Sequence, residues 1–222
     1  MKDAIIIEHN PKQMPITKAV IWLHGLGANG YDFVPVVPEL GLSDEVGVRF
    51  IFPNAPKLPV TINGGYVMPA WYDILEMGDL SRKVDVVQIN QSANRIKEIV
   101  KAQENDCILP KDIVVAGFSQ GGAVAYQVAM TLPKLGGLLA LSTYFATASE
   151  FDKHSVLASE ALPICIQHGT YDDVVSATLG AQAKTALESL GFKPSFKLYP
   201  MAHQVCMAQI RDIGAWLNER FI

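Results

Sequence analysis

The sequence predicts an α/β fold in which helices cover both faces of a mainly parallel sheet. Strand-like and helix-like segments alternate from one end of the chain to the other, and the strand-like ones are short and apolar, as in sheets buried on both sides. Neither a linker nor an internal repeat interrupts the series. With 222 residues, 50% of them hydrophobic, the chain can bury a large core, and we expect one domain over residues 1–222.

Six segments are expected to form strands. Each is apolar or rich in β-branched and aromatic residues, and Gly, Pro or Asn lies close to the ends of the inner ones. The inner strands are expected at residues 19–23, 48–52, 113–116, 138–141 and 164–167, and a late strand is expected at 195–199.

Helices are expected between these strands. Val86, Ile89, Ala93, Ile96 and Val100 recur at helical spacing, and polar residues occupy the opposite face, which predicts an amphipathic helix. A run of small residues predicts a second helix at 122–130. Two further helices are expected at 178–190, where Gly191 ends the pattern, and at 205–220.

Residues 53–78 break the alternation. This stretch is apolar, rich in Pro and Gly, and without a helical period. Long connections of this kind inside an α/β domain are often lids or binding loops, although a loop that only covers the core is the alternative. If it is a lid, its apolar side chains suit an acyl chain, and the residues we expect to bind substrate are Ile62, Met68, Trp71 and Leu75.

Composition excludes several classes of function. The net charge of -4 and the scattered Lys and Arg residues argue against nucleic acid as a partner. The N-terminal apolar run is too short for a signal peptide and no later stretch is long enough to span a bilayer, so we expect a cytoplasmic protein. Three cysteines without C-x-x-C spacing indicate neither disulfides nor a zinc site, and no metal is expected.

The segment Gly117-Phe118-Ser119-Gln120-Gly121 lies between the strand at 113–116 and the helix at 122–130. Gly-x-Ser-x-Gly in that setting is typical of a nucleophile elbow, a turn so sharp that the serine takes a strained backbone and its hydroxyl stands clear of the sheet. An ordinary tight turn between strand and helix is the alternative. The context favours Ser119 as a nucleophile.

A serine nucleophile needs an imidazole to accept its proton and a carboxylate to orient that ring. In chains with this elbow the order is Ser, then acid, then His. Asp172 and Asp173 follow the strand at 164–167, and either suits the acid, with helix capping as the alternative role for at least one. His203 follows the strand at 195–199, where the base is expected. The other histidines (His9, His24, His154 and His168) fit this order less well, and structural hydrogen bonding is expected for His24 and His168.

The reaction also requires N–H donors for the oxyanion. One is expected from Gln120, the residue after the nucleophile. The other is expected from the glycine-rich loop at 24–30, with the backbone N–H of Leu26 as the donor. A phosphate-binding loop is the rival interpretation of residues 24–30. It fails because no Lys-Ser/Thr follows and the spacing is not G-x-G-x-x-G, so no nucleotide cofactor is expected.

Several motifs in fixed order give the chain a family resemblance: His24-Gly25-Leu26-Gly27, Phe52-Pro53-Asn54-Ala55-Pro56, Asn63-Gly64-Gly65, Met68-Pro69-Ala70-Trp71-Tyr72-Asp73, Gly117-Phe118-Ser119-Gln120-Gly121-Gly122, His168-Gly169-x-x-Asp172 and Met201-x-His203. Over nearly its whole length the chain resembles the acyl-protein thioesterase and carboxylesterase family of small α/β-hydrolases. The resemblance implies that Asp172 rather than Asp173 is the acid. It also implies hydrolysis of acyl thioesters and oxygen esters, removal of palmitoyl groups from proteins, an acyl pocket around Trp71, and homodimers.

The chain departs from the family at three positions: Pro200 precedes Met201, Gln204 follows His203, and Asp173 stands where Pro is frequent. Because proline fixes its own backbone, Pro200 restricts the loop that carries His203. Carboxylesterase action on small esters, or lysophospholipase action, is the alternative within the enzyme class, and a non-catalytic ligand-binding scaffold is the alternative outside it. A further hypothesis is peripheral membrane contact through the apolar lid, to collect a lipidated substrate.

Overall fold

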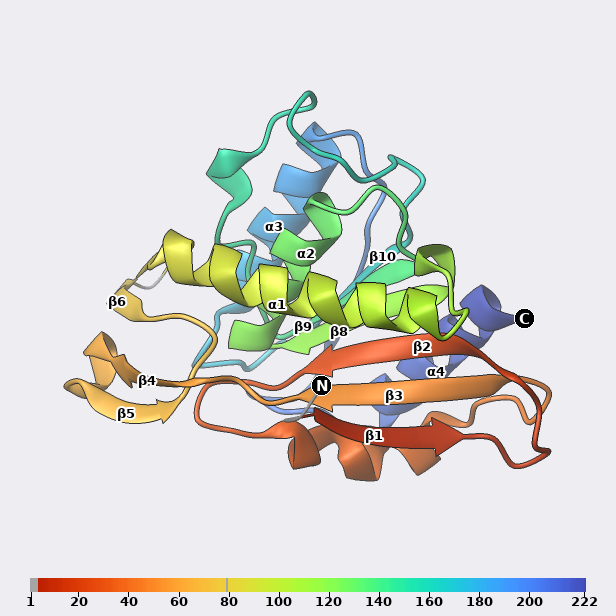
Figure 1. Cartoon of the computed structure of the whole chain (residues 1–222). Coiled ribbons are helices and arrows are strands. Elements are labelled where there is room, and N and C mark those ends of the chain that lie inside the picture. The colour runs from red at the N-terminus through yellow and green to blue at the C-terminus, as the bar shows by residue number, and fades with distance from the viewer. Residues whose placement is uncertain (1–3, 79) are drawn as a thin grey trace.

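In residues 4–78 and 80–222, which the computed structural model describes, seven strands form the central sheet (Figure 1). Every neighbouring pair is parallel except the edge pair β1 and β3. In spatial order the strands are β1 (Ala4–His9), β3 (Gly47–Pro53), β2 (Ile16–Leu23), β8 (Ile113–Phe118), β9 (Gly137–Leu141), β10 (Ile164–Gly169) and β11 (Ser195–Tyr199).

Helices cover both faces of this sheet, as the alternation of segments predicts. On one face lie α1 (Val86–Asn105), α2 (Gln120–Met130) and α3 (Ala177–Ser189). On the other lie α4 (Met207–Phe221) and the 3₁₀ segment η1 (Gly30–Leu40). Successive strand residues point alternately to the two faces of the sheet. On β2, Ile21 belongs to the hydrophobic core on the face covered by α1, α2 and α3, and Trp22 belongs to the core on the face covered by α4 and η1. Short 3₁₀ turns occur at η2 (Thr61–Asn63), η3 (Pro110–Asp112) and η4 (Ala148–Glu150).

The six expected strands and four expected helices are all present, with bounds that differ by a few residues. Two of the elements that were not expected lie in the N-terminal part of the chain. Residues 4–9 form β1 along the edge of the sheet, where every second side chain is solvent-facing. Residues 30–40 form η1, which contains Pro35 and Pro38. Because proline has no backbone N–H to donate, these residues argue against a helix when only the sequence is considered.

Residues 53–78 contain more regular structure than the sequence indicates. Strands β4 (Lys57–Val60) and β5 (Tyr66–Pro69) form an antiparallel hairpin, and β6 (Ile74–Gly78) pairs with β7 (Ser81–Val84). Gly64 and Gly65 turn the first hairpin, both at positive φ (66° and 78°). Figure 1 shows this segment beyond the carboxyl ends of β2 and β3. It therefore stands at the edge where the active sites of parallel α/β folds assemble.

No helix in the part of the chain that the structure describes is long and apolar enough to cross a membrane.

Candidate active site

Ser119 occupies the turn between β8 and α2, with φ 54° and ψ -122°. This conformation is costly for a residue with a side chain and is held by its surroundings. A Cβ on Gly117 would collide with the Gly121 carbonyl, and a Cβ on Gly121 would stand 2.5 Å from the His24 carbonyl oxygen. Both glycines of Gly-x-Ser-x-Gly are thus required by close backbone contacts.

Hydrogen bonds with the last residue of β9 and with the segment after it fix the strained turn. The Ser119 N–H donates to the Leu141 carbonyl at 2.9 Å, and the Thr143 hydroxyl donates to the Ser119 carbonyl at 2.6 Å. Within the turn, the Gly122 N–H donates to the same carbonyl at 2.9 Å. The side chain of Ser119 is left to project from the end of the sheet toward the cavity described below.

His203 and Asp172 converge on Ser119 from two loops. His203 Nε2 lies 2.9 Å from Ser119 Oγ, and His203 Nδ1 lies 2.8 Å from Asp172 Oδ2. Asp172 follows β10, and His203 lies between β11 and α4. The two loops touch where Gly169 packs against the Met201 and Ala202 carbonyls, and Pro200 leaves the imidazole within reach of the serine.

Asp172, not Asp173, reaches the imidazole. The Asp172 side chain is buried, whereas Asp173 is exposed. Asp172 Oδ1 accepts the N–H groups of Val174 and Val175 at 3.0 and 2.8 Å, which leaves Oδ2 for His203. Burial alone would raise the pKa of Asp172, but the N–H groups of His168, His203 and Val175 that lie near the carboxylate hold that pKa well below its usual range. The carboxylate is therefore ionised at neutral pH.

A second histidine contacts the same carboxylate. His168 is fully buried, and its Nε2 lies 2.7 Å from the Val175 carbonyl oxygen and 3.5 Å from Asp172 Oδ2. The carbonyl can only accept, so Nε2 carries the proton and the ring positions both the carboxylate and its loop. Sequence reasoning gave His168 a structural role but missed the carboxylate, although the spacing His168-x-x-x-Asp172 was a usable signal.

The two expected oxyanion donors line the same cavity as Ser119. Gln120 is the first residue of α2, so its N–H is among those that no helical carbonyl accepts. The Leu26 N–H makes no backbone hydrogen bond to any residue in the described ranges. Its neighbour Gly27 is held by a bond from its N–H to the Pro69 carbonyl, at 2.8 Å.

Trp71 forms hydrogen bonds to both segments that carry the expected oxyanion donors, the His24 loop and the start of α2. Its indole N–H donates to the His24 carbonyl at 2.8 Å, and its backbone N–H donates to Gln120 Oε1 at 2.8 Å. The Gln120 side chain in turn donates to the Tyr72 carbonyl at 2.7 Å. The segment after β5 thus fixes the positions of the His24 loop and of the first residue of α2.

His24 has a structural role, as expected. Its Nε2 accepts the Ala55 N–H at 3.1 Å, so Nδ1 carries the proton and donates to the Gly25 carbonyl at 2.7 Å. Burial lowers the pKa of His24, and this effect outweighs those of the Gly25 carbonyl and Asp32, which act in the opposite direction. The lowered pKa keeps the ring neutral. Of the remaining histidines, His9 is the last residue of β1 and His154 lies in an exposed loop.

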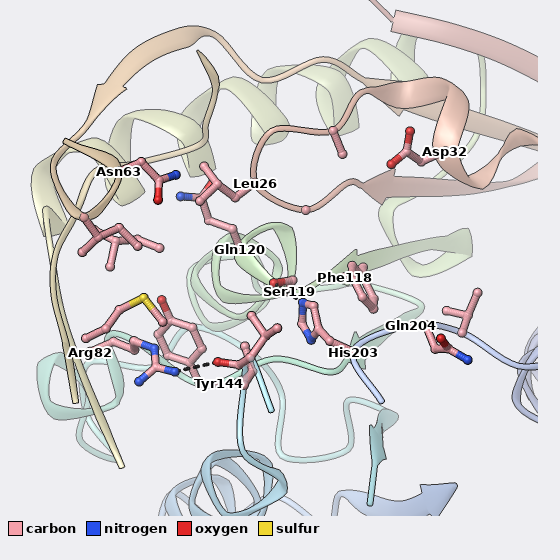
Figure 2. Close-up of a pocket in the computed structure, with 18 of the residues that line it drawn as sticks. Leu26, Asp32, Asn63, Arg82, Phe118, Ser119, Gln120, Tyr144, His203 and Gln204 are labelled. Atoms are coloured by element: carbon pink, nitrogen blue, oxygen red, sulfur yellow. Dashed lines mark hydrogen bonds between the residues drawn. The ribbon is translucent and has the colours of Figure 1, made fainter. Parts of the chain in front are cut away.

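The cavity at Ser119 has a volume of about 500 Å³, within the usual range for small-molecule sites (Figure 2). Of the four residues expected to bind substrate, Ile62 lines this cavity, whereas Met68, Trp71 and Leu75 do not. Trp71 is 1% exposed, and it braces backbone instead. Sequence reasoning missed most of the wall, which includes Phe33, Met77, Arg82, Tyr144, Val174 and Val205.

Within residues 4–78 and 80–222, no group of three His, Cys, Asp or Glu side chains is arranged so that it could hold a metal ion.

The chain is similar in sequence and in fold to acyl-protein thioesterases. Acyl-protein thioesterase 1 of Saccharomyces cerevisiae is 36% identical over 217 residues, which cover 94% of this chain and 95% of that protein. Acyl-protein thioesterase 1 of Debaryomyces hansenii is 35% identical over 92% of both chains. The crystal structure of Zea mays acyl-protein thioesterase 2 superposes with a TM-score of 0.82 at 26% identity, over 97% of this chain and 98% of that one.

The profile of the Phospholipase/Carboxylesterase family matches residues 4–220, nearly the whole chain. The fold is accordingly the α/β-hydrolase fold, as the elbow at Ser119 indicates. On the family match and the identity to the yeast proteins, this chain belongs to the phospholipase/carboxylesterase family of α/β-hydrolases.

Proposed function

We propose that this chain is a serine hydrolase that cleaves acyl thioesters and oxygen esters through a covalent acyl-enzyme. The observation that carries the proposal is the continuous hydrogen-bonded path from Ser119 Oγ to His203 Nε2 (2.9 Å) and from His203 Nδ1 to Asp172 Oδ2 (2.8 Å). Hydrolysis is the activity of the family, and the names of the yeast and maize relatives favour acyl thioesters among its substrates.

In the proposed mechanism, His203 Nε2 takes the hydroxyl proton as Ser119 Oγ attacks the acyl carbonyl carbon. The N–H groups of Leu26 and Gln120 then stabilise the negative charge on the former carbonyl oxygen. The imidazolium, held by Asp172, gives its proton to the leaving thiolate or alkoxide, which departs. Water, deprotonated by the same imidazole, attacks the acyl-enzyme and releases the acid with Ser119 restored.

Labelling with a fluorophosphonate probe tests this proposal. The native chain should be labelled, Ser119→Ala should not, and Ser189→Ala, which changes an exposed serine at the end of α3, should be labelled as the native chain is. Hydrolysis of a panel of thioesters and oxygen esters should follow the same pattern. A native chain that is neither labelled nor active would favour the non-catalytic scaffold instead.

The physiological substrate we propose is a lipidated protein, from which the enzyme removes palmitoyl groups. The support is the relatives' printed name together with the apolar side chains in the cavity wall. Lysophospholipid is the competing acyl donor, since the family name includes phospholipase activity. Release of palmitate from an S-palmitoylated peptide and from a lysophospholipid, compared at equal concentration, decides between these two substrates. Cytoplasmic location and homodimer formation remain predictions of the sequence.

We further propose peripheral membrane contact through the β4–β5 hairpin. On β5, Tyr66 is 70% exposed and Val67 is 56% exposed, so their side chains are available for an interface. Trp71 cannot contribute because it is buried. Co-sedimentation with phosphatidylcholine vesicles should weaken in a Tyr66→Ser, Val67→Ser double variant, and unchanged co-sedimentation would contradict the proposal.

A further inference from the structure

Arg82 of β7 lies in the wall of the active-site cavity, among apolar side chains that include Ile74, Met77 and Val174. In Figure 2 its guanidinium group points into the same space as the Tyr144 ring, on the other side of Ser119 from His203 and Gln204. Arg82 is partly exposed, and a cation is an uncommon feature in the wall of a site for a plain hydrocarbon chain.

The charge of Arg82 has no carboxylate to neutralise it among the described residues. Its guanidinium donates to three backbone carbonyls: those of Gly78 and Ser81, and that of Val174 at 2.8 Å (the dashed line in Figure 2). Because a guanidinium group has five N–H donors, about two remain for another acceptor. The next residue, Lys83, differs, since it forms an ion pair with Glu76 at 2.8 Å.

The Tyr144 hydroxyl is a second donor at this end of the cavity. It lies 2.8 Å from the hydroxyl of Tyr72, which is fully buried and has no other described partner. If Tyr144 donated to Tyr72, the Tyr72 proton would be left buried and unpaired, so Tyr72 donates and Tyr144 accepts. The Tyr144 proton is then free to be donated into the cavity, whose wall this residue helps to form.

Electrostatics place the arginine and the two phenols in one cluster. Burial raises the pKa of Tyr72 and of Tyr144, and the positive charge of Arg82 acts on both in the opposite direction. Both phenols are therefore protonated donors at neutral pH, and both lie close enough to Arg82 to experience its charge.

The position of His203 decides which part of a substrate would meet this cluster. The imidazolium protonates the leaving group, so the leaving group lies on the His203 side of Ser119. On that side Figure 2 shows Gln204 and Asp32. Arg82 and Tyr144 lie on the other side, where the acyl group extends away from the reacting carbonyl.

We propose that Arg82 and Tyr144 form a subsite for an anionic group at the far end of the acyl chain. In addition to the fatty acyl groups proposed above, the site would then accept esters or thioesters of short dicarboxylic acids, in which one carboxyl is esterified and the other is free. A carboxylate fits because it accepts two parallel N–H bonds from guanidinium and a further bond from a phenol. This inference rests on the proposed hydrolase function, since it assigns the acyl side of the same site.

The competing explanation is that Arg82 only ties the β6–β7 hairpin to the loop that carries Asp172, through the Val174 carbonyl. Both explanations predict that activity falls when the guanidinium is removed, but they differ in which substrates are affected. A tie would affect every substrate in the same proportion, whereas a subsite would affect the charged acyl group selectively.

The test compares thioesters of adipic acid, with one carboxyl free, and thioesters of hexanoic acid, which has the same chain length without the charge. The readout is the ratio of kcat/KM for the two substrates. In Arg82→Gln the ratio should fall about 10-fold or more relative to the native chain, and in Tyr144→Phe it should fall by a smaller factor. Lys83→Gln, which removes the neighbouring exposed cation, should leave the ratio unchanged.

An equal ratio in the native chain and Arg82→Gln would overturn the subsite, and so would a parallel loss of both activities. Calorimetric titration of adipate into Ser119→Ala separates this result from failure of the hydrolase proposal. Binding should weaken about 10-fold or more when Arg82→Gln is added to Ser119→Ala. If the native chain hydrolyses neither thioester and is not labelled by the fluorophosphonate probe, the proposed function fails, and this titration still decides whether the subsite exists.

Discussion

The Cα atom of Gly121 lies against the backbone of His24, so closely that a Cβ at Gly121 would stand 2.5 Å from the His24 carbonyl oxygen. The first turn of α2 and the start of the Leu26 loop are thus in direct backbone contact. Because the proposed oxyanion donors belong to these two segments, a single glycine sets the separation between Leu26 and Gln120.

Gly121→Ala is expected to lower kcat by about 10²–10³-fold, similar to the loss of one oxyanion donor. The added methyl group must displace backbone, since no flexible side chain is there to move aside. The measurement is kcat and KM on a soluble ester together with the thermal midpoint. An enzyme with native kcat would show that the two segments can separate without harm to the oxyanion site.

Trp71→Phe is expected to lower kcat about 10-fold or more while the chain stays folded. The substitution keeps an aromatic ring but removes the indole N–H that donates to the His24 carbonyl at 2.8 Å, so the Leu26 loop loses a brace. Steady-state kinetics on a short-chain ester, with circular dichroism to check folding, measures the effect.

Trp22→Phe is the matched control for this prediction. Trp22 is also 1% exposed, but its indole N–H has no hydrogen-bond partner in the described part of the chain. Loss of the ring volume is therefore common to the two variants, and loss of the hydrogen bond is specific to Trp71→Phe. Equal reductions of kcat in both would mean that packing, not the bond to His24, explains the result.

His168→Phe is expected to reduce the free energy of unfolding by about 1–3 kcal/mol and to lower kcat. The change leaves the Val175 carbonyl without its donor and removes one of the two imidazoles beside Asp172. Urea unfolding and kcat measure the two effects. His154→Phe, at an exposed position, is the control and should be neutral in both.

A result in which His168→Phe loses stability but keeps native kcat would assign His168 to the loop alone. Such an outcome would contradict its positioning of the Asp172 carboxylate. The distinction matters because the 3.5 Å separation between His168 Nε2 and Asp172 Oδ2 is longer than an ordinary hydrogen bond.

Ile62→Phe is expected to shift substrate preference toward shorter acyl chains, because a larger side chain at the cavity wall reduces the space for the acyl group. The measurement is kcat/KM across p-nitrophenyl esters from acetate to laurate. Ile6→Phe, at a position on β1 that is 45% exposed, controls for a general effect of the substitution. An unchanged chain-length profile in Ile62→Phe would place the acyl group elsewhere.

The parts of the site that sequence could predict are those that follow from local geometry or chain order. The elbow at Ser119 is a local requirement for glycine, and the places of Asp172 and His203 follow from strand ends that meet at one edge of a parallel sheet. The choice between Asp172 and Asp173 needed the resemblance, because adjacent residues differ only in which one the loop turns inward.

The cavity wall could not be predicted in the same way. Phe33, Tyr144, Val174 and Arg82 come from segments distant in sequence, and hydrophobic residues in an irregular stretch look alike whether they line a cavity or brace backbone. Trp71 illustrates this: its apolar ring suggested substrate contact, but its indole N–H is committed to the His24 carbonyl. Only the tertiary arrangement distinguishes these two roles.

Asp172→Asn is expected to lower kcat by about 10³–10⁴-fold and to remove part of the dependence of stability on pH. The pKa of Asp172 in the folded chain lies below its ordinary value of 3.8, because donors from His168, His203 and Val175 outweigh burial. A carboxyl with a depressed folded pKa stabilises the fold fully above its unfolded pKa. That stabilisation is lost as pH falls toward the folded pKa, since the unfolded chain takes up the proton first.

The free energy of unfolding of the native chain should therefore exceed that of Asp172→Asn at pH 7, and the difference should shrink below about pH 4, by at most about 1.4 kcal/mol per pH unit. Urea unfolding at pH 3, 4, 5 and 7 measures it. Asp173→Asn, which changes the exposed neighbour, should keep the native dependence on pH. If the difference between native and Asp172→Asn stayed constant from pH 7 to pH 3, the hydrogen bonds to this carboxylate would not stabilise its charged form.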